Sequence, residues 1–511
     1  MLPDNPFGEI DGARAPVSEL IDDFIPFDVS PSSGDLGVRI LAGRKGSGKT
    51  IVLRRLLVSV SENNSIYIDQ LQQDTPSTED IIRYARLHDG GNPDEAWKLL
   101  WNRAFLRSVV SHLTWATIGS APLCAEARGV FEQYDGKFIS KVKAPCSVYS
   151  QLAALIHAFP TKRIVEHLQD PRWQEIEHHL ARLLQHSRPM YFFVDSADEN
   201  FSHAPRFWLE CQKGLFLQLL SFLRGVSFGG RLHIFAALRD LVLASMQHSE
   251  HSTRYVADAR VASLVWGYNS IRDFLNRKLA ALPKQYLIAP NDADPLVRWL
   301  GRRTITNVRR RVEEDLYDYL IRHTRLIPRD IVSLGNQLCS VVAIARKARA
   351  PVVGEAAIRE CVSAAAKRFG NEQLLICTNE IACDAMPKEA ALKSSQFYLD
   401  NQAYLDFVEQ AIRTVIKSIG VDRFKAARLQ TAIDESVDIV GVDVMNVLWK
   451  NGLLGFRDRG VDGVRETFFD STGALADELP RDKREYVFHP CVIDAVGIRG
   501  SGKRPPHINH H

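Results

Sequence analysis

Short apolar runs and long helical patterns alternate along the first half of the chain. Runs with the length and composition of buried strands occur at GVRILAG (37–43), SIYIDQL (65–71), MYFFVDS (190–196) and RLHIFAALRD (231–240). Between them, residues 50–62 and most of 76–188 repeat their apolar positions with the period of an α-helix, and Trp97, Leu100 and Trp101 fall on one face. Strands that alternate with long helices predict an α/β layer built on a parallel sheet.

Beyond residue 262 the helical period continues alone, so we expect 262–385 to contain no strand. The last part of the chain contains both helical and strand periods. Residues 442–460 have the pattern of a helix that ends at an Asn-Gly pair and continues into a strand, and RETFFDS (465–471) and REYVFHP (484–490) have the pattern of a strand pair. Helices followed by a β-hairpin predict a winged-helix-like domain at about 400–495.

These changes of pattern divide the chain into five parts. The start is rich in Pro, Asp, Ser and Gly, and the end is rich in basic residues. The predicted parts are an irregular lead-in at 1–36, an α/β core at 37–261 with a helical insert at about 76–188, a helical lid region at 262–385, the winged-helix-like domain at 400–495, and a basic tail at 496–511.

Composition and charge narrow the class of protein. The 511 residues are 45% apolar and 24% charged, as in globular proteins with sizeable cores. A net charge of +3, from 64 basic and 61 acidic residues, gives no general attraction to nucleic acid or membrane. No signal peptide or long apolar run is evident, so we expect a cytoplasmic protein with no membrane contact. The eight cysteines form no C-x-x-C pair, which favours reduced, buried thiols over disulfides or a zinc site.

Two glycine-rich segments resemble a phosphate-binding loop of the pattern G-x-x-x-x-G-K-[ST]. GRKGSGKT (43–50) lies between a predicted strand and a predicted helix, as such a loop requires. GIRGSGKR (497–504) has Arg504 in place of Ser or Thr, and a diproline follows where a helix has to begin. We therefore assign the first segment as a P-loop and the second to the basic tail.

Each residue of the first segment has a predicted role in binding ATP. Backbone N–H groups at a helix N-terminus converge on phosphate, and glycines let the backbone approach it closely. Lys49 would reach the β- and γ-phosphates, and the Thr50 hydroxyl would ligate Mg²⁺. The predicted nucleotide-binding residues are Gly43, Arg44, Lys45, Gly46, Ser47, Gly48, Lys49 and Thr50.

The ends of two later strands supply further polar groups. Asp195 follows the apolar run YFFV and would hold Mg²⁺ through water, and either Asp198 or Glu199 would orient or deprotonate the attacking water. Arg239 ends the next strand, where a cation could sense the γ-phosphate or pair locally with an acid. Arg254 and Arg260 are weaker candidates for arginine fingers that act across a subunit interface.

Taken together, GRKGSGKT, YFFVDSADE and FAALRD are similar in order and spacing to the STAND-type branch of P-loop ATPases, which is related to AAA+ proteins and origin-recognition initiators. In that branch a small residue follows the magnesium aspartate, as Ser196 does here, and an arginine ends the sensor strand. RLIPRDIVSLGNQL (325–338) resembles the lid segment of bacterial members, which implies that Arg329 contacts the γ-phosphate. The resemblance covers about 37–495 and is poorest in the insert.

The resemblance implies a slow ATPase that couples nucleotide state to oligomerisation or to a partner effector protein. Many such proteins serve in bacterial anti-phage defence, which makes that role one expectation. A second hypothesis is a scaffold that binds a nucleotide without hydrolysing it and relays a signal to a partner. The tryptophans of the helical insert would then be either part of a core or a docking surface for that partner. A third is an ATP-licensed DNA-binding protein. It rests on the winged helix and on the arginines of the helical pattern at 301–315, namely Arg302, Arg303, Arg309, Arg310 and Arg311.

Overall fold

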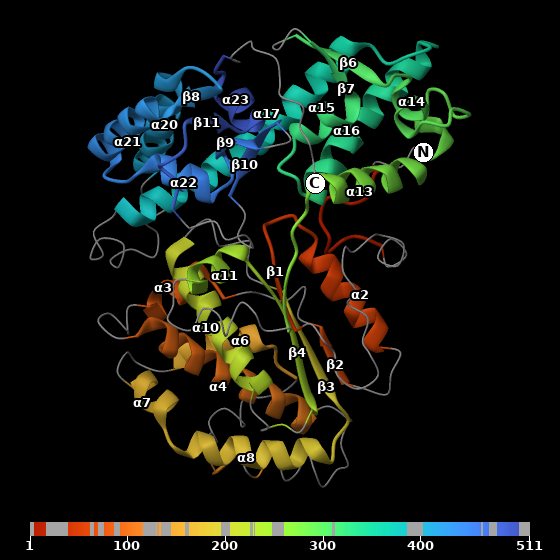
Figure 1. Cartoon of the computed structure of the whole chain (residues 1–511). Coiled ribbons are helices and arrows are strands. Elements are labelled where there is room, and N and C mark those ends of the chain that lie inside the picture. The colour runs from red at the N-terminus through yellow and green to blue at the C-terminus, as the bar shows by residue number, and fades with distance from the viewer. Residues whose placement is uncertain are drawn as a thin grey trace.

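The computed structural model describes residues 5–16, 39–61, 66–69, 76–85, 92–115, 129, 132–133, 145–158, 163–195, 205–224, 228, 230–247, 260–308, 312–385, 402–460, 463–469 and 478–499. A parallel sheet with helices on both faces forms one end of the molecule, and helices with a small antiparallel sheet form the other (Figure 1). Among the described residues, no helix combines the length and apolar character needed to cross a membrane.

The main sheet has five strands in the order β2-β3-β4-β1-β5, and every neighbouring pair is parallel. The strands are β1 (Ile40–Ala42), β2 (Ile66–Asp69), β3 (Met190–Val194), β4 (Leu232–Leu238) and β5 (Val261–Ser263). The predicted α/β class and the four predicted strands are confirmed. The edge strand β5 was not predicted, because three residues are too few to display a strand period.

Both faces of this sheet are buried. Phe193 and Phe235 point to the face covered by α2 (Lys49–Ser61), and their rings stack at 5.4 Å between centroids. Phe192 and the β3 residues two positions before and after it point to the other face. Helices α4 (Pro93–Trp115) and α10 (Pro205–Arg224) cover this face (Figure 1). Burial on both faces explains why these strands are continuous apolar runs instead of alternating ones.

The described residues of the insert are mainly helical, as predicted. Its helices are α3 (Thr78–Ala85), α4, α6 (Val148–Ala158), α7 (Arg163–Gln169) and α8 (Arg172–Gln185). Trp97, Trp101 and Trp173 are at most 2% exposed, and the Trp101 indole donates to the Cys211 carbonyl at 2.9 Å. These three side chains are therefore core and do not form a docking surface. The side chain of Trp115 lies outside the described residues.

The lid region is helical except for one hairpin. Its helices are α13 (Tyr268–Ala280), η2 (Lys284–Tyr286), α14 (Pro295–Leu300), α15 (Leu316–Arg322), α16 (Pro328–Lys347) and α17 (Glu355–Ala385). The expectation of no strand here is wrong, because β6 (Thr304–Asn307) and β7 (Val312–Asp315) pair in antiparallel fashion. In β6, exposed threonines alternate with the buried side chains of Ile305 and Asn307, which is a strand period that a helical reading of 301–315 overlooks.

The C-terminal part contains a second, antiparallel sheet with the order β10-β9-β11-β8. Its elements are α20 (Gln402–Ile419), β8 (Arg423–Lys425), α21 (Ala426–Val440), α22 (Val444–Lys450), β9 (Leu454–Gly460), β10 (Gly463–Phe468), β11 (Glu485–Phe488) and α23 (Pro490–Val496). The predicted helix end is confirmed, since Gly452 follows α22 with a φ of +68°. The predicted pairing of β10 with β11 is wrong. Both strands pair with β9, because the short β9–β10 connection makes that pair the hairpin.

The long helix α17 belongs to both the lid and the C-terminal part. It crosses α23 so closely that a Cβ atom on Gly370 would lie 2.2 Å from the Cys491 carbonyl oxygen. Its buried face contributes to one hydrophobic core that also contains residues of α16, α22 and α23. The lid and the C-terminal sheet are therefore packed together by a helix that they share.

Of the predicted lead-in, the structure describes residues 5–16, which form no helix or strand, as predicted, and are anchored to the lid. Phe7 is 1% exposed, its ring lies 5.1 Å from that of Trp299, and its N–H donates to the Asn336 side chain at 2.8 Å. Asn336 also donates to the Gly8 carbonyl at 3.1 Å. No periodic pattern in the sequence identifies this docking, because a single aromatic side chain provides it.

Candidate functional site

The predicted phosphate-loop and magnesium residues meet at one edge of the main sheet. Gly43 directly follows β1, and its N–H donates to the Leu238 carbonyl at the end of β4 at 3.1 Å. Asp195 follows β3, and Arg239 follows β4. Because these strands are parallel, their carboxyl ends share an edge, which is where ligands of open α/β sheets bind.

The loop between β1 and α2 turns through two glycines in the left-handed region. Gly46 has a φ of +87° and Gly48 a φ of +101°, which L side chains adopt only with strain. Gly43 is restricted by space instead, since a Cβ atom there would lie 2.7 Å from the Ser47 hydroxyl. A turn of this kind at a helix N-terminus exposes successive N–H groups and forms an anion-binding concavity.

The polar groups inside the loop fit a phosphate. Lys49 is 5% exposed, and its ammonium group donates to the Gly43 and Arg44 carbonyls at 2.7 and 3.0 Å. The Ser47 hydroxyl is buried and makes no hydrogen bond with any described residue. A buried hydroxyl without a partner is costly, so a ligand that accepts a hydrogen bond from it would stabilise the loop.

The two predicted magnesium ligands are in direct contact. The Thr50 hydroxyl donates to a carboxylate oxygen of Asp195 at 2.5 Å, although 145 residues separate the two in the chain. The Tyr149 hydroxyl donates to the backbone carbonyl of Asp195 and so fixes the end of β3. Among the described residues, no three His, Cys, Asp or Glu side chains are grouped for metal binding. An ion at this pair would take its other ligands from water and phosphate, as Mg²⁺ commonly does.

The other predicted site residues differ in where they lie relative to the loop. Arg239 is 6% exposed beside the loop, and its backbone N–H donates to the Gln212 side chain at 3.1 Å. Arg260 lies at the opposite edge of the sheet, where its carbonyl accepts from the Ile40 N–H and its guanidinium donates to the Leu223 carbonyl at 2.6 Å. Arg260 is therefore not part of this chain's own site. The remaining candidates, Ser196, Asp198, Glu199 and Arg254, lie outside the described residues.

The lid touches the loop where α16 begins. The Arg329 N–H donates to the Gly46 carbonyl at 3.3 Å. A Cβ atom on Gly46 would lie 3.0 Å from the Cβ of Arg329 and 3.1 Å from a methyl carbon of Ile327. No hydrogen bond or ion pair joins the half-buried Arg329 guanidinium to another described residue. The predicted second sensor is thus next to the loop.

Two groups at the loop were not predicted as contacts. The Trp266 indole donates to the Ser47 carbonyl at 2.8 Å, from the segment after the unpredicted strand β5. Arg44 was expected to contribute its backbone, but its side chain forms an ion pair with Asp240 at 3.5 Å and donates to the Phe469 carbonyl of the C-terminal part. The loop is therefore in contact with the lid and with the C-terminal part, as well as with the core.

One buried histidine stands near Arg44 and the lid. The pKa of His489 is lowered to about 4, chiefly by burial; Asp330 opposes this shift, and Arg325 and Arg44 add to it. The Cys491 N–H donates to Nδ1 of His489 at 3.2 Å, so the neutral ring carries its proton on Nε2.

Comparisons of this chain with protein-family models, curated proteins and solved structures found no match.

Proposed function

We propose that this chain binds ATP with Mg²⁺ and hydrolyses it slowly to ADP and phosphate, in the manner of STAND and AAA+-like P-loop ATPases. The observation that carries the proposal is the 2.5 Å hydrogen bond between Thr50 and Asp195 at the mouth of a glycine turn. A hydroxyl at the start of a helix and a carboxylate at the end of a neighbouring strand are the pair that holds magnesium in P-loop enzymes.

The chain's own groups would act on the phosphates in a defined way. The loop N–H groups and the buried Lys49 ammonium would face the β- and γ-phosphates, with Lys49 exchanging its two carbonyl partners for phosphate oxygens. Thr50 would bind the metal directly, and Asp195 would bind it through water. Bound Mg²⁺ would neutralise charge that develops on the phosphate oxygens.

Turnover requires groups that act on water and on the γ-phosphate. Asp198 or Glu199, shortly after β3, would orient the attacking water. Arg239 and Arg329 would stabilise the charge on the transferred group, as arginines do in related chemistry. Both arginines lie beside the loop, one after β4 and one at the start of α16.

We further propose that the nucleotide state controls a conformational switch. Arg329 belongs to the lid and Arg44 touches the C-terminal part, so a change in the loop would reach both. The readout would be oligomerisation or the binding of a partner effector protein, and a role in bacterial anti-phage defence is one setting for it.

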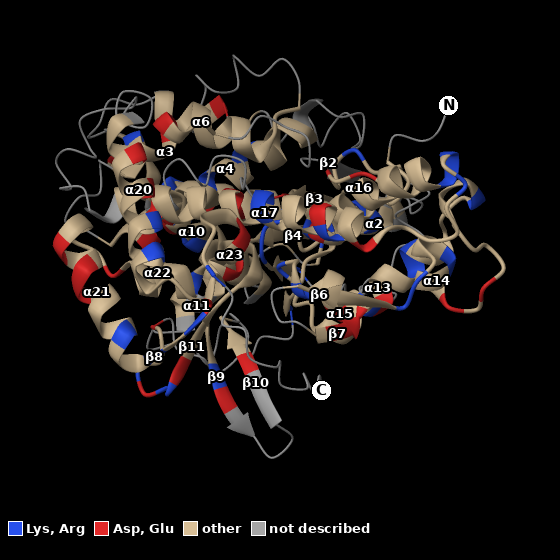
Figure 2. Cartoon of the chain, turned by 90° about the horizontal axis from the view of Figure 1, so that it is seen from above, with Lys and Arg blue, Asp and Glu red and all other residues tan. Residues whose placement is uncertain are grey.

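The C-terminal elements support a winged-helix-like domain. Helix, strand, two helices and three antiparallel strands follow one another, and β9, β11 and β8 are neighbours in the sheet. Acidic residues lie along α21 (Figure 2), and most of α22 is buried. Such a surface suits a protein partner better than DNA.

The described part of the arginine segment also gives little support to DNA binding. Arg302 forms an ion pair with Glu355 at 2.7 Å, and Arg303 forms one with Asp294 at 2.7 Å. The arginines at 309–311 lie outside the described residues. An ATP-licensed DNA-binding protein stays a prediction, and loss of DNA affinity between low and moderate salt would be its signature.

A binding and turnover experiment tests the proposal. Purified wild-type chain is titrated with ATP, with Mg²⁺ or with EDTA, in a calorimeter, and phosphate release is then measured for wild type, Asp198→Asn and Glu199→Gln. We expect ATP binding that Mg²⁺ strengthens, and phosphate release that at least one of the two variants loses. Absence of any binding by the wild type at millimolar ATP would overturn the proposal.

A further inference from the structure

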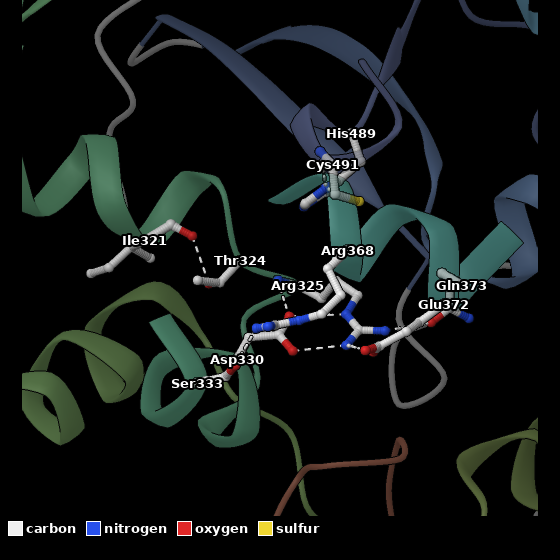
Figure 3. Close-up of polar contacts among 10 residues, drawn as sticks. All are labelled: Ile321, Thr324, Arg325, Asp330, Ser333, Arg368, Glu372, Gln373, His489 and Cys491. Carbon is white, nitrogen blue, oxygen red and sulfur yellow. Dashed lines mark hydrogen bonds and ion pairs between the residues drawn. The ribbon is translucent and has the colours of Figure 1, made fainter. Parts of the chain in front are cut away.

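The turn that precedes α16 is enclosed by a buried ion pair at its two ends. Arg325 donates to the Asp330 carboxylate from its backbone N–H at 3.0 Å, from Nε at 2.9 Å and from Nη2 at 2.7 Å (Figure 3). Asp330 is fully buried, and the Arg325 side chain is 13% exposed. Three hydrogen bonds thus close the chain segment RLIPRD on itself.

The ion pair is itself fixed to α17. A second guanidinium nitrogen of Arg325 donates to the Gln373 side chain at 2.9 Å, and Glu372 lies 3.5 Å away. Burial acts to lower the pKa of Arg325, but the Asp330 carboxylate raises it, and the net shift is upward. The loss of either member of this pair would leave the charge of the other buried without compensation.

Within the enclosed turn, the backbone has a conformation that its residues do not favour. Leu326 has a φ of +54°, and the described residues include only one other non-glycine residue with a positive φ, Arg349. A leucine in the left-handed region is strained, and it keeps this shape only where neighbouring contacts impose it. The three hydrogen bonds between Arg325 and Asp330 span this residue and supply that constraint.

The turn presents its next residues to the phosphate loop. Ile327 and Arg329 pack against Gly46, and the Arg329 N–H donates to the Gly46 carbonyl. The Arg329 guanidinium, half-buried and without a partner among the described residues, is left for a ligand. The turn sets where the backbone of Arg329 meets the loop, because Pro328 has a fixed φ and begins α16 immediately before it.

We propose that Arg325 and Asp330 are positioning residues that set Arg329 against the phosphate loop and so allow the site to distinguish ATP from ADP. This inference rests on the proposed ATP site and adds the origin of its γ-phosphate selectivity. Without the pair, Leu326 leaves the left-handed region and Arg329 loses its register with Gly46. In a variant that still folds, the preference for ATP over ADP falls.

The test compares affinities for Mg·ATP and Mg·ADP by calorimetry in wild type, Arg329→Ala, Asp330→Asn and Arg325→Lys. Removal of a charge-assisted contact should lower the ATP-to-ADP affinity ratio of Arg329→Ala by about 10-fold or more. Asp330→Asn keeps the size of the side chain, and Arg325→Lys keeps the charge but loses the forked geometry. Both should lower the ratio by about 5-fold, with a smaller change in ADP affinity.

A matched control separates positioning from general stability. Arg322 and Glu314 form another ion pair of the lid, 2.8 Å long with both side chains 12% exposed, outside the enclosed turn. Glu314→Gln should lower the thermal midpoint of the protein and leave the ATP-to-ADP ratio unchanged. Arg325→Lys serves as the test variant if Asp330→Asn does not fold.

The outcomes separate this inference from the function on which it rests. If the wild type binds no ATP, the proposed function itself fails. If the wild type binds ATP and Asp330→Asn and Arg325→Lys keep the wild-type ratio, the positioning role is overturned while the proposed function stands. The same holds if Arg329→Ala leaves the ratio unchanged, or if Glu314→Gln lowers it as much as Asp330→Asn does.

Discussion

Two segments of this chain share the pattern G-x-x-G-S-G-K, and the elements that precede them differ. In 43–50 the segment leaves a buried strand and enters α2, and its inner glycines curl the backbone into a concavity. In 497–504 the first glycine terminates α23 with a φ of +76°, and its N–H donates to the Ile493 carbonyl at 2.9 Å. The strand before and the helix after decide the function of such a segment, because they orient its N–H groups.

Removal of the lysine from each segment should have the largest effect and tests whether only the first segment binds phosphate. Lys49→Ala deletes a buried ammonium group within the loop, and we expect ATP affinity to fall about 100-fold or more, as for other buried charged contacts. Lys503→Ala should change it by less than about 2-fold. Calorimetric titration of both variants checks this. Equal losses would mean that the C-terminal segment also binds phosphate.

The predicted magnesium ligands Thr50 and Asp195 give a second test of the comparison. The C-terminal segment has Arg504 where the loop has Thr50, so it lacks this pair. Asp195→Asn replaces the carboxylate that accepts from Thr50 by a neutral amide, and we expect ATP affinity in Mg²⁺ to fall about 10-fold to 100-fold, as for other metal-site changes. With EDTA, wild type and variant should bind ATP equally. A difference of the same size in EDTA would show that Asp195 does not act through the metal.

The glycines test whether backbone strain or ligand contact matters. Both Gly46→Ala and Gly497→Ala put a side chain in the left-handed region, which should cost about 1–2 kcal/mol of stability each. Only Gly46→Ala should also weaken ATP binding, by about 10-fold, since its new methyl group meets Arg329. Thermal unfolding and ATP titration of the two variants separate these effects. A loss of ATP binding in Gly497→Ala would contradict the assignment of the tail.

The smallest effect concerns the side chain of the loop's second residue. Arg44 has Ile498 as its counterpart in the C-terminal segment. Arg44→Ala removes a partly exposed ion pair with Asp240 and a hydrogen bond to Phe469, and we expect a loss of about 1 kcal/mol of stability. Denaturant unfolding measures it, with Ile498→Ala as the matched change. Unaltered stability would remove Arg44 as a link between the loop and the C-terminal part.

The predictable parts of this molecule are those with a local signal. The central strands are apolar runs, and the phosphate loop is a spaced pattern between a strand and a helix, so Thr50 and Asp195 could be placed at one edge from sequence alone. The hairpin β6–β7 was missed because its strand period is only four residues long on each side. The pairing of β10 and β11 was misassigned because composition identifies strands but not their neighbours.

The contacts that complete the site had no such signal. Trp266 lies 219 residues from its partner Ser47, and Arg44 lies 425 residues from Phe469. Neither contact follows from a periodic pattern, since each depends on how whole elements pack. Arg329 was found through its Pro-Arg-Asp motif, but the ion pair that encloses its turn was visible only in the structure.

The continuity of α17 limits how this molecule can change shape. One unbroken helix from Glu355 to Ala385 contributes to the cores of the lid and of the C-terminal sheet. A movement of the lid against the α/β core would therefore carry the C-terminal sheet with it, because separating those two parts would require α17 to break. The segment between β5 and α13 connects the core to the lid, and it lies next to the loop that would bind the nucleotide.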